Sequence, residues 1–174
     1  MYHVPTIRDA SLPWLASVRT LGLETYFMIE IEVKTFKKLT NKELYELLRL
    51  RSEVFVVEQD CVYEDLDGKD QKALHVIGTK EGEIVAYARI FKSGDYTDEA
   101  SIGRVVVKKN QRKFGYGKII MKNAIHAVHD HFNENVIRVS AQMYLERFYH
   151  DLGFNQVGDG YLEDGIPHIG MVRK

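Results

Sequence analysis

A basic, glycine-containing segment in the middle of the chain has the residue types that bind a phosphate group. Residues 112–118 read Arg-Lys-Phe-Gly-Tyr-Gly-Lys and follow the β-branched run Val105-Val106-Val107. Glycines at 115 and 117 let backbone amides approach a ligand, and the start of a helix adds unpaired N–H groups and the positive end of its dipole. A turn of this kind suits a pyrophosphate. The alternative is a basic loop that needs two glycines only in order to turn.

The charged residues near this segment support a phosphate site, and the residue spacing excludes two well-known phosphate-binding motifs. A local cluster of cations, which the near-neutral total charge conceals, consists of Lys108, Lys109, Arg112, Lys113, Lys118 and Lys122. Ile119 follows Lys118 where a P-loop has serine or threonine, and no third glycine completes a dinucleotide-binding fingerprint. Both of those motifs are therefore excluded.

Cysteine and histidine give weaker chemical signals. Cys61 is the single cysteine and has no histidine partner in its sequence context, so it is interpreted as a small buried or loop residue and not as an acyl carrier. His126, His129 and His131 are spaced so that they cannot all share one face of a helix, and no cysteine joins them. No metal site is predicted.

Hydrophobic periodicity predicts the elements that position these residues. Residues 29–34 alternate apolar and charged side chains, as a half-buried strand does. Thr40 and Glu43 form a capping box before a helix that runs to Arg51. Further strands are expected at 74–79 and 84–91, which pair antiparallel, at 101–109, at 136–141 and, as two short strands about Asp164-Gly165, from 154 to the C-terminus, with helices at 117–132 and 143–152.

The order of these elements predicts an α/β fold of the α+β kind, in which helices flank a central mixed β-sheet. The strand–helix–strand unit from 101 to 141 must cross over and return parallel, whereas the other strands are joined by short turns. Residues 54–70 interrupt the pattern because they are irregular and strongly acidic. They are interpreted as a long loop or a short helix.

Length and composition favour one soluble globular domain. The 174 residues are 45% hydrophobic and 28% charged, which excludes a disordered chain. No stretch approaches the roughly 20 apolar residues of a membrane-spanning helix. Lys and Arg number 24 against 25 for Asp and Glu, so the net charge of -1 gives no global attraction to nucleic acid or to an anionic membrane. The cysteine count and the lack of a recognisable secretory signal predict a cytoplasmic protein.

The first 27 residues differ from the rest of the chain. They carry two of the three prolines, show no regular period and precede an internal methionine, Met28. The sequence leaves open whether residues 1–27 are a flexible extension, a remnant of cloning or the result of an upstream choice of start codon. The single domain is expected to cover residues 28–174.

Two motifs resemble the GCN5-related N-acetyltransferase (GNAT) family. The first is an Arg-x-x-Gly-x-Gly turn, here from Arg112 to Gly117, which follows a Val-x-Val strand. The second is a helix that ends in Tyr-x-x-x-Gly-Phe, here from Tyr149 to Phe154, preceded by Gln142 where many members have asparagine. Three further stretches, 51–59, 102–105 and 163–171, are similar to the ElaA-type branch of the family. The resemblance covers essentially residues 28–174.

The resemblance implies a GNAT-type acyl-CoA N-acyltransferase that moves an acetyl group from acetyl-CoA to a primary amine by direct attack in a ternary complex. The amine belongs to a small molecule or a peptide; no metal, nucleic acid or membrane is implied, and a homodimer is compatible with the resemblance. A thioester is already activated, so the protein must position the amine, remove its proton, stabilise an oxyanion and help the thiolate leave. The implied acetyl-CoA-binding residues are Val105, Val106, Val107, Arg112, Lys113, Phe114, Gly115, Tyr116, Gly117, Lys118, Gln142, Phe148 and Tyr149.

The resemblance also suggests catalytic residues. Tyr149 stands where the family has the acid that assists the departing sulfur, and the alternative is a core tyrosine with a solvated hydroxyl. The candidates for the base, which are also expected to bind substrate, are Glu58, Glu163 and His168, with a water chain as the alternative. Arg104 lies in an apolar strand and needs a partner, either a loop carboxylate or a carboxylate of the substrate.

The acidic segment predicts the charge of the acceptor. Its carboxylates are Glu58, Asp60, Glu64, Asp65, Asp67 and Asp70. The family places this loop beside the acceptor groove, so the acids are expected to attract an ammonium group; a solvated loop remote from the groove is the alternative. The competing function is a non-catalytic acyl-CoA-binding or regulatory module. Nucleic-acid binding by the 108–122 cluster is disfavoured by the net charge and by the scarcity of aromatic residues beyond Phe114 and Tyr116.

Overall fold

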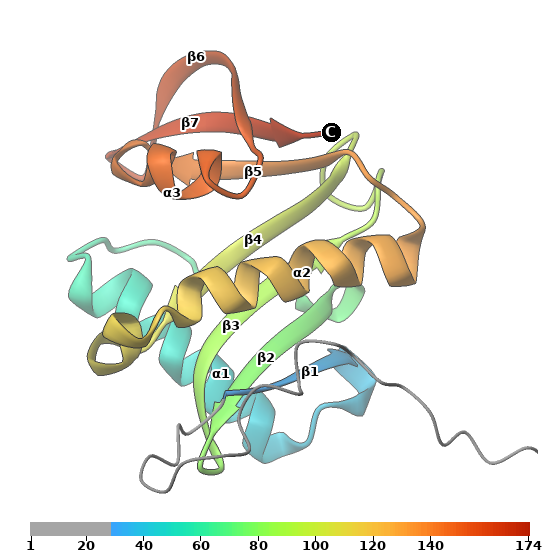
Figure 1. Cartoon of the computed structure of the whole chain (residues 1–174). Helices are drawn as coiled ribbons and strands as arrows, with labels where there is room; N and C mark the ends of the chain where they lie inside the picture. Colours follow the sequence, from blue (N-terminus) through green and yellow to red (C-terminus); the bar gives the residue numbers. More distant parts are fainter. Residues whose placement is uncertain (1–28) are drawn as a thin grey trace, which may run out of the picture.

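A mixed sheet forms the centre of the protein, whose computed structural model describes residues 29–174 (Figure 1). The sheet has 7 strands in the order β1-β2-β3-β4-β5-β7-β6. The elements are β1 (Glu30–Thr35), α1 (Asn41–Arg51), β2 (Leu74–Lys80), β3 (Glu83–Phe91), β4 (Ala100–Val107), α2 (Tyr116–Phe132), β5 (Ile137–Gln142), α3 (Glu146–His150), β6 (Asn155–Glu163) and β7 (Ile166–Arg173). The predicted fold class is confirmed. The prediction on residues 1–27 lies outside the described residues.

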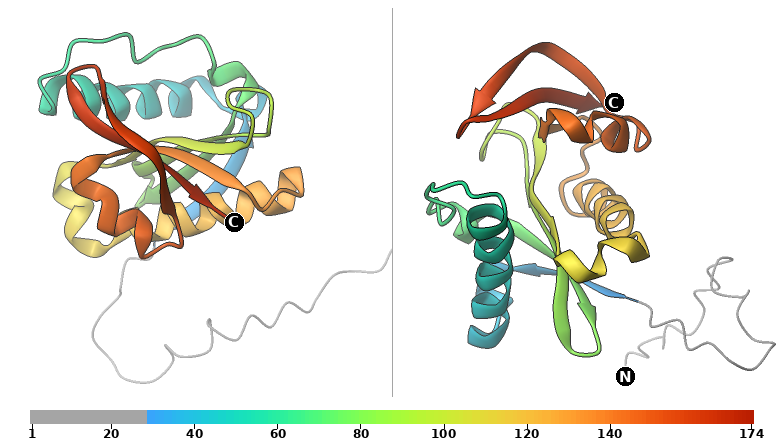
Figure 2. Two further views of the ribbon diagram at one scale, coloured as in Figure 1. Left: turned by 90° about the horizontal axis from the view of Figure 1, so that it is seen from above. Right: turned by 90° about the vertical axis from the view of Figure 1, so that its left-hand side faces the viewer.

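Helices cover the two faces of the sheet unequally. Figure 2 shows α1 on one face and α2 on the other. The core beneath α1 includes Leu47, Ile77 and Tyr87, and the larger core beneath α2 includes Ile120 and Met121, all of them nearly or fully buried. Helix α2 packs against β2, β3 and β4, whereas the short α3 packs against β5. The α1 face of β5, β7 and β6 therefore has no helix over it in the part of the chain that the structure describes.

The start of α1 has the capping box predicted from the sequence. The Glu43 amide donates to Thr40 Oγ1 at 3.2 Å, and the Thr40 amide donates to Glu43 Oε2 at 2.8 Å. A hydrogen bond from Lys34 and the one from the Thr40 amide hold the pKa of Glu43 at about 2. The first turn of this helix is thus satisfied by the protein itself.

Strands β4 and β5 pair only briefly before they separate. Their parallel register consists of Ala100 with Ile137 and Ser101 with Arg138, which confirms the parallel return expected from the crossover. Within residues 29–174, no β5 residue pairs with β4 beyond Ser101. Strand β4 also contains an irregularity, because Arg104 has a φ of 49° and the β3–β4 register shifts opposite it. The rest of β4 consequently has an edge that no β5 strand covers.

The predicted helix over 143–152 is shorter than expected. Residues Met143–Leu145 form a 3-10 turn and only Glu146–His150 is α-helical. The acidic segment is partly helical, since Ser52–Glu58 continues α1 as a π-helix and residues 59–69 are irregular. Both alternatives proposed for this segment are therefore realised, one after the other.

Buried ion pairs hold the irregular segment against the sheet. Asp65 accepts from Arg51 Nε at 2.9 Å and from Arg104 Nε at 2.8 Å. Asp70 accepts from Arg51 Nη1 at 2.8 Å and from Arg89 Nη1 at 2.9 Å. These residues belong to α1, β3, β4 and the segment between α1 and β2. The network ties one irregular segment to three regular elements.

The third carboxylate of the network, Asp67, bonds Arg89 at 2.6 and 2.8 Å. Burial acts to raise the pKa of Asp67, but the hydrogen bonds from Arg89 outweigh it and the pKa lies below its ordinary value. The expectation that the acidic segment attracts an ammonium group is thereby corrected. Asp65, Asp67 and Asp70 are occupied by guanidinium groups, so most of the expected negative field is cancelled inside the protein.

The network predicts a large loss of stability when one carboxylate is neutralised. Asp70→Asn should lower the free energy of unfolding by about 3–5 kcal/mol, because two buried guanidinium groups lose a shared partner. Urea denaturation measures the difference. The control is Glu99→Gln, which removes a more exposed pair with Arg138 and should cost at most about 1 kcal/mol. Equal effects of the two substitutions would contradict the role given to the network.

Candidate active site

A cavity of about 1120 Å³ lies where β4 and β5 separate. Its wall includes Val105, Val106 and Val107 of β4, the start of α2, and residues of β5, α3, β6 and β7. The volume is above the usual range for one small-molecule ligand. The cavity can therefore hold two reactants side by side.

The turn before α2 brings a helix start without a side-chain cap to one end of this cavity. The 3-10 segment Lys109–Phe114 ends at Gly115, which has a φ of 74° and is the N-cap of the 17-residue α2. Among the described residues no side chain caps α2, in contrast to the capped start of α1. The first turn of α2 is thus open to an anionic ligand.

Gly117 faces the cavity. A Cβ atom at this position would lie 3.7 Å from Phe148 Cζ and 3.8 Å from Val107 Cγ2, so a methyl group fits without disturbing the protein. A larger side chain would extend between β4 and α3, where the cavity lies. The glycine therefore keeps open the passage between the uncapped amides and the separated strands.

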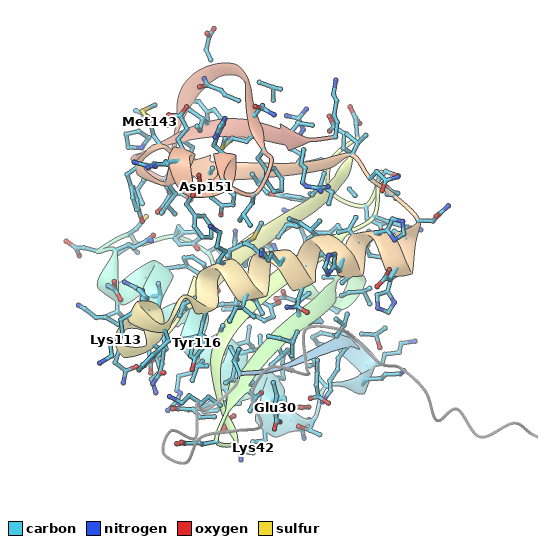
Figure 3. The ribbon with its side chains drawn as sticks, in the orientation of Figure 1. Glu30, Lys42, Lys113, Tyr116, Met143 and Asp151 are labelled. Carbon is cyan, nitrogen blue, oxygen red and sulfur yellow. The ribbon has the colours of Figure 1, made fainter. Side chains whose placement is uncertain are left out.

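Cations surround the turn, and some of them are already paired. Figure 3 shows Lys113 and Tyr116 at the start of α2 and Asp151 on the α3 side. Lys118 Nζ lies 3.8 Å from Asp151 Oδ2. Arg112 donates to Glu58 at 2.6 and 3.0 Å and to the Val107 carbonyl at 3.1 Å. The turn combines a helix start that no side chain caps with a positive rim, an arrangement that suits a pyrophosphate.

The structure brings most of the predicted acetyl-CoA-binding residues to the cavity. Those on its wall are Val105, Val106, Val107, Arg112, Gly115, Gly117, Lys118, Gln142, Phe148 and Tyr149. Lys113, Phe114 and Tyr116 are not on the wall. Tyr116 is 5% exposed and packs in the core beneath α2, whereas Lys113 lies over the Phe114 ring on the surface.

Tyr149 is held rigidly between two aromatic rings. It lies on α3, is 6% exposed, and makes edge-to-face contacts with Phe148 and Phe154 at centroid distances of 5.1 and 5.9 Å. Burial raises the pKa of its phenol above the ordinary value of 10.0. The hydroxyl therefore stays protonated near neutral pH and can donate a hydrogen bond into the cavity.

The predicted acceptor-side residues have different surroundings. His168 donates from Nδ1 to the Ile166 carbonyl at 2.8 Å, which leaves Nε2 as the acceptor nitrogen. Glu58 is paired with Arg112, and the hydrogen bond from that guanidinium lowers its pKa, the opposite of the shift a general base near neutral pH needs. Arg104 holds a loop carboxylate, Asp65, which is the first of its two alternatives.

The wall also contains a polar cluster that the sequence interpretation missed. Ser140 Oγ lies 2.6 Å from Tyr161 Oη and 2.7 Å from Glu163 Oε2. Only Glu163 was singled out from the sequence. Tyr161 and Glu163 are two residues apart on β6 and therefore share a face, which was an available signal. Nothing in the sequence around Ser140 identifies it as a residue of the site.

Two contacts join the segment after the π-helix to the C-terminal half of the sheet. The Gln59 and Gln142 side-chain amides pair at 3.1 and 3.5 Å. The Cys61 thiol donates to the Asp164 carbonyl at 3.3 Å. Gln142, which stands where many family members have asparagine, therefore reaches across the cavity wall. Cys61 is buried and serves as a structural contact here.

Within residues 29–174, no group of three or more His, Cys, Asp or Glu side chains is arranged to hold a metal ion. In the same part of the chain, no helix is long and apolar enough to cross a membrane.

Comparison with known proteins gives a consistent result. The model of the GNAT acetyltransferase domain matches residues 32–174. Protein ElaA of Escherichia coli is 42% identical over 149 residues, which is 84% of this chain and 97% of ElaA. The crystal structure of that protein superimposes with a TM-score of 0.79 over 84% of this chain and 100% of its own.

Two other relatives extend the comparison. The crystal structure of an acyl-CoA N-acyltransferase from Pseudomonas aeruginosa has a TM-score of 0.79 and 39% identity, over 83% of this chain and 99% of its own. A UPF0039 protein from Schizosaccharomyces pombe is 41% identical over 82% of this chain and 95% of its own. The match of the family model includes every residue on the wall of the cavity.

The geometry at Gly117 predicts a specific loss of acetyl-CoA binding. Gly117→Val should weaken acetyl-CoA binding by at least about tenfold, because its branched side chain fills the passage between Val107 and Phe148. Isothermal titration calorimetry measures the affinity, and thermal unfolding shows that the variant is folded. Gly117→Ala is the graded control, since one methyl group fits, and it should bind more tightly than the valine variant. Unchanged affinity in folded Gly117→Val would place the ligand elsewhere.

Proposed function

The chain belongs to the GNAT acetyltransferase family, in its ElaA-like branch, and on this basis we propose that it transfers the acetyl group of acetyl-CoA to a primary amine. The transfer takes place by direct attack of the amine in a ternary complex. The observation that carries the proposal is the cavity at the separation of β4 and β5, which reaches both the uncapped start of α2 and a polar wall on the opposite half of the sheet. One cavity thus serves two ligands.

The residues at the α2 end are suited to the phosphates of acetyl-CoA. The uncapped start of α2 would bind the pyrophosphate through its positive dipole end and the Gly117 amide, and Lys113 and Lys118 would supply positive charge near it. The uncovered edge of β4 offers the backbone groups of Val105, Val106 and Val107 to the extended arm and to the thioester oxygen. Acetyl-CoA supplies the activated acyl group, and the protein holds its thioester in place for attack by the amine.

Tyr149 is proposed as the acid that assists the departing sulfur. Its phenol is protonated, fixed by Phe148 and Phe154, and on the wall of the cavity beside Gly117 and Phe148. A donor in this position stabilises the thiolate as the tetrahedral intermediate collapses. Because its pKa is raised by burial, this donor remains available throughout the physiological pH range.

A thiol-release assay tests the proposed function. Acetyl-CoA is offered with a panel of amines that includes diamines, polyamines, aryl-ethylamines, lysine derivatives and peptides with free N-termini, and free CoA is measured with a thiol reagent. Mass spectrometry of the acceptor must show a gain of one acetyl group. Tight binding of acetyl-CoA without turnover of any amine would favour a non-catalytic acyl-CoA-binding module.

The proposed role of Tyr149 predicts a change in rate without a change in affinity. Tyr149→Phe should lower kcat by about ten- to ten-thousand-fold and leave acetyl-CoA affinity unchanged, because the packing between Phe148 and Phe154 is kept. No alkaline loss of activity should arise from Tyr149 below about pH 10, since its pKa is raised. The matched control is Tyr45→Phe on the exposed side of α1. Full activity of Tyr149→Phe would reduce Tyr149 to a packing residue.

A further inference from the structure

We propose that Glu163, Ser140 and Tyr161 form the subsite that binds the ammonium group of the acceptor, and that Glu163 takes the first proton from it. This inference rests on the proposed function and names the class of acceptor, an amine that arrives as a cation. It replaces the acidic segment, whose buried aspartates are occupied by arginines, as the source of negative charge at the site.

The donor and the acceptor of each hydrogen bond among Tyr161, Ser140 and Glu163 are fixed by their chemistry. Ser140 has a single hydroxyl proton, and the acceptor-only carboxylate of Glu163 takes it at 2.7 Å. Tyr161 must therefore donate its own proton to Ser140 Oγ, at 2.6 Å. The chain of donors runs from Tyr161 through Ser140 to Glu163. The two hydroxyl groups thus hold the Oε2 side of the carboxylate in place and leave Oε1 for a ligand.

The register of the strands explains how residues of β5 and β6 meet across β7. Ser140 is paired with Gly170, and Tyr161 is paired with His168. A Cβ atom at Gly170 would lie 3.2 Å from the Val157 carbonyl oxygen, so a side chain there would crowd β6 where it passes close to β7. No side chain at 170 separates Ser140 from Tyr161. The Tyr161 ring is further held by stacking on His168 at a centroid distance of 6.1 Å.

Among the described residues Glu163 has no cationic partner, and of the acidic residues on the cavity wall it shares this only with its neighbour Asp164. Glu58 is paired with Arg112, and Asp65 with Arg51 and Arg104. Within residues 29–174, Glu163 accepts only the Ser140 hydroxyl, and its Oε1 atom accepts no hydrogen bond from the protein.

Arg138, the cation on the same wall, does not compete for this carboxylate. It is bound by Glu99 at 2.6 and 2.8 Å. A ligand can therefore supply the charge that complements Glu163, and a primary ammonium group brings both that charge and the donors for Oε1.

The cluster is also accessible. Tyr161 is 43% exposed and Glu163 is half-buried, and both line the cavity. His168, in contrast, is 9% exposed beneath the Tyr161 ring, with its Nδ1 committed to the Ile166 carbonyl. A ligand entering along the face of β5, β7 and β6 therefore reaches Glu163 before it reaches His168.

The acceptor nitrogen loses two protons during the reaction, and a different residue handles each of them. The ammonium group transfers one proton to the Glu163 carboxylate, which later releases it to water. The neutral amine attacks the thioester carbon, so that a C–N bond forms and the C–S bond breaks. The second proton leaves the nitrogen as the sulfur is protonated through Tyr149. An amide, a thiol and one proton in solution are the products, and no other reactant is needed.

Kinetics of three variants test the subsite. Glu163→Gln should lower kcat/KM for primary amines about 10²- to 10⁴-fold and leave acetyl-CoA affinity unchanged. Ser140→Ala and Tyr161→Phe weaken the support of the charged carboxylate, so each should move the acid limb of the kcat/KM profile upward by about one pH unit. A residue that only supports the fold would lower activity without moving this limb.

The other groups facing Glu163 must be separated from it in the pH profile. They are Arg138 on β5, His168 on β7, Tyr161 on β6, Asp164 in the following turn and Cys61 opposite that turn. His168→Gln is therefore measured in parallel. Loss of the acid limb in His168→Gln together with its retention in Glu163→Gln would overturn the assignment. Glu30→Gln on β1 and Ser93→Ala on the surface are matched controls that should behave as wild type.

The design separates failure of the subsite from failure of the proposed function. If the wild type acetylates amines and both Glu163→Gln and Ser140→Ala match it in rate and pH profile, the subsite is wrong and the function stands. If the wild type acetylates no amine, the function fails, and the subsite is then tested by NMR with ethylammonium chloride as the probe. A shift of the Tyr161 ring signals that is lost in Glu163→Gln supports the subsite, and no shift in the wild type overturns it.

Discussion

The buried network of aspartates and arginines is the constraint on which the rest of the molecule depends. A guanidinium group inside a protein is tolerated only when carboxylates surround it, so Arg51, Arg89 and Arg104 each dictate where a segment of chain must lie. The segment between α1 and β2 has no regular structure of its own over residues 59–69, yet its aspartates bond all three arginines and are held by them in one position. That position fixes one wall of the cavity. It also holds Arg104 in its left-handed conformation, where β4 departs from regular pairing.

The distribution of charged groups also gives the cavity two chemically different ends. At one end the amides of an uncapped helix and the surrounding lysines favour phosphates, and at the other a carboxylate supported by two hydroxyls favours a cation. Between them lie the bare edge of β4 and a protonated phenol. The buried ion pairs of Arg51, Arg89 and Arg104 are structural, whereas the Glu163 carboxylate has no cationic partner among the described residues and is left for a ligand. A count of acidic residues along the sequence does not reveal this distinction, because the partners come from distant elements.

Local signals made most of the fold predictable. The capping box at Thr40, the alternation in β1, the run of valines in β4 and the glycines before α2 each act within a few residues of their effect. Prediction failed where the interaction is long-range: Gln59 contacts Gln142, 83 residues away, and Cys61 contacts Asp164, 103 residues away. The acidic segment was misinterpreted for the same reason, although an arginine in the apolar strand β3 was a sign that carboxylates were needed there. Ser140 carried no sign at all, since a serine on a strand acquires its role from its neighbours across the sheet.

The brief pairing of β4 with β5 has a mechanical consequence. The two halves of the sheet carry different helices, α2 on one and α3 on the other, and only two residue pairs of the central ladder join them. A ligand that lies along the free edge of β4 takes the place of the missing ladder and spans the joint. Its binding energy then adds directly to the cohesion between the halves, by about 2.7 kcal/mol at a hundred times Kd. Amide hydrogens beside the joint are consequently those whose exchange with solvent a bound ligand slows most.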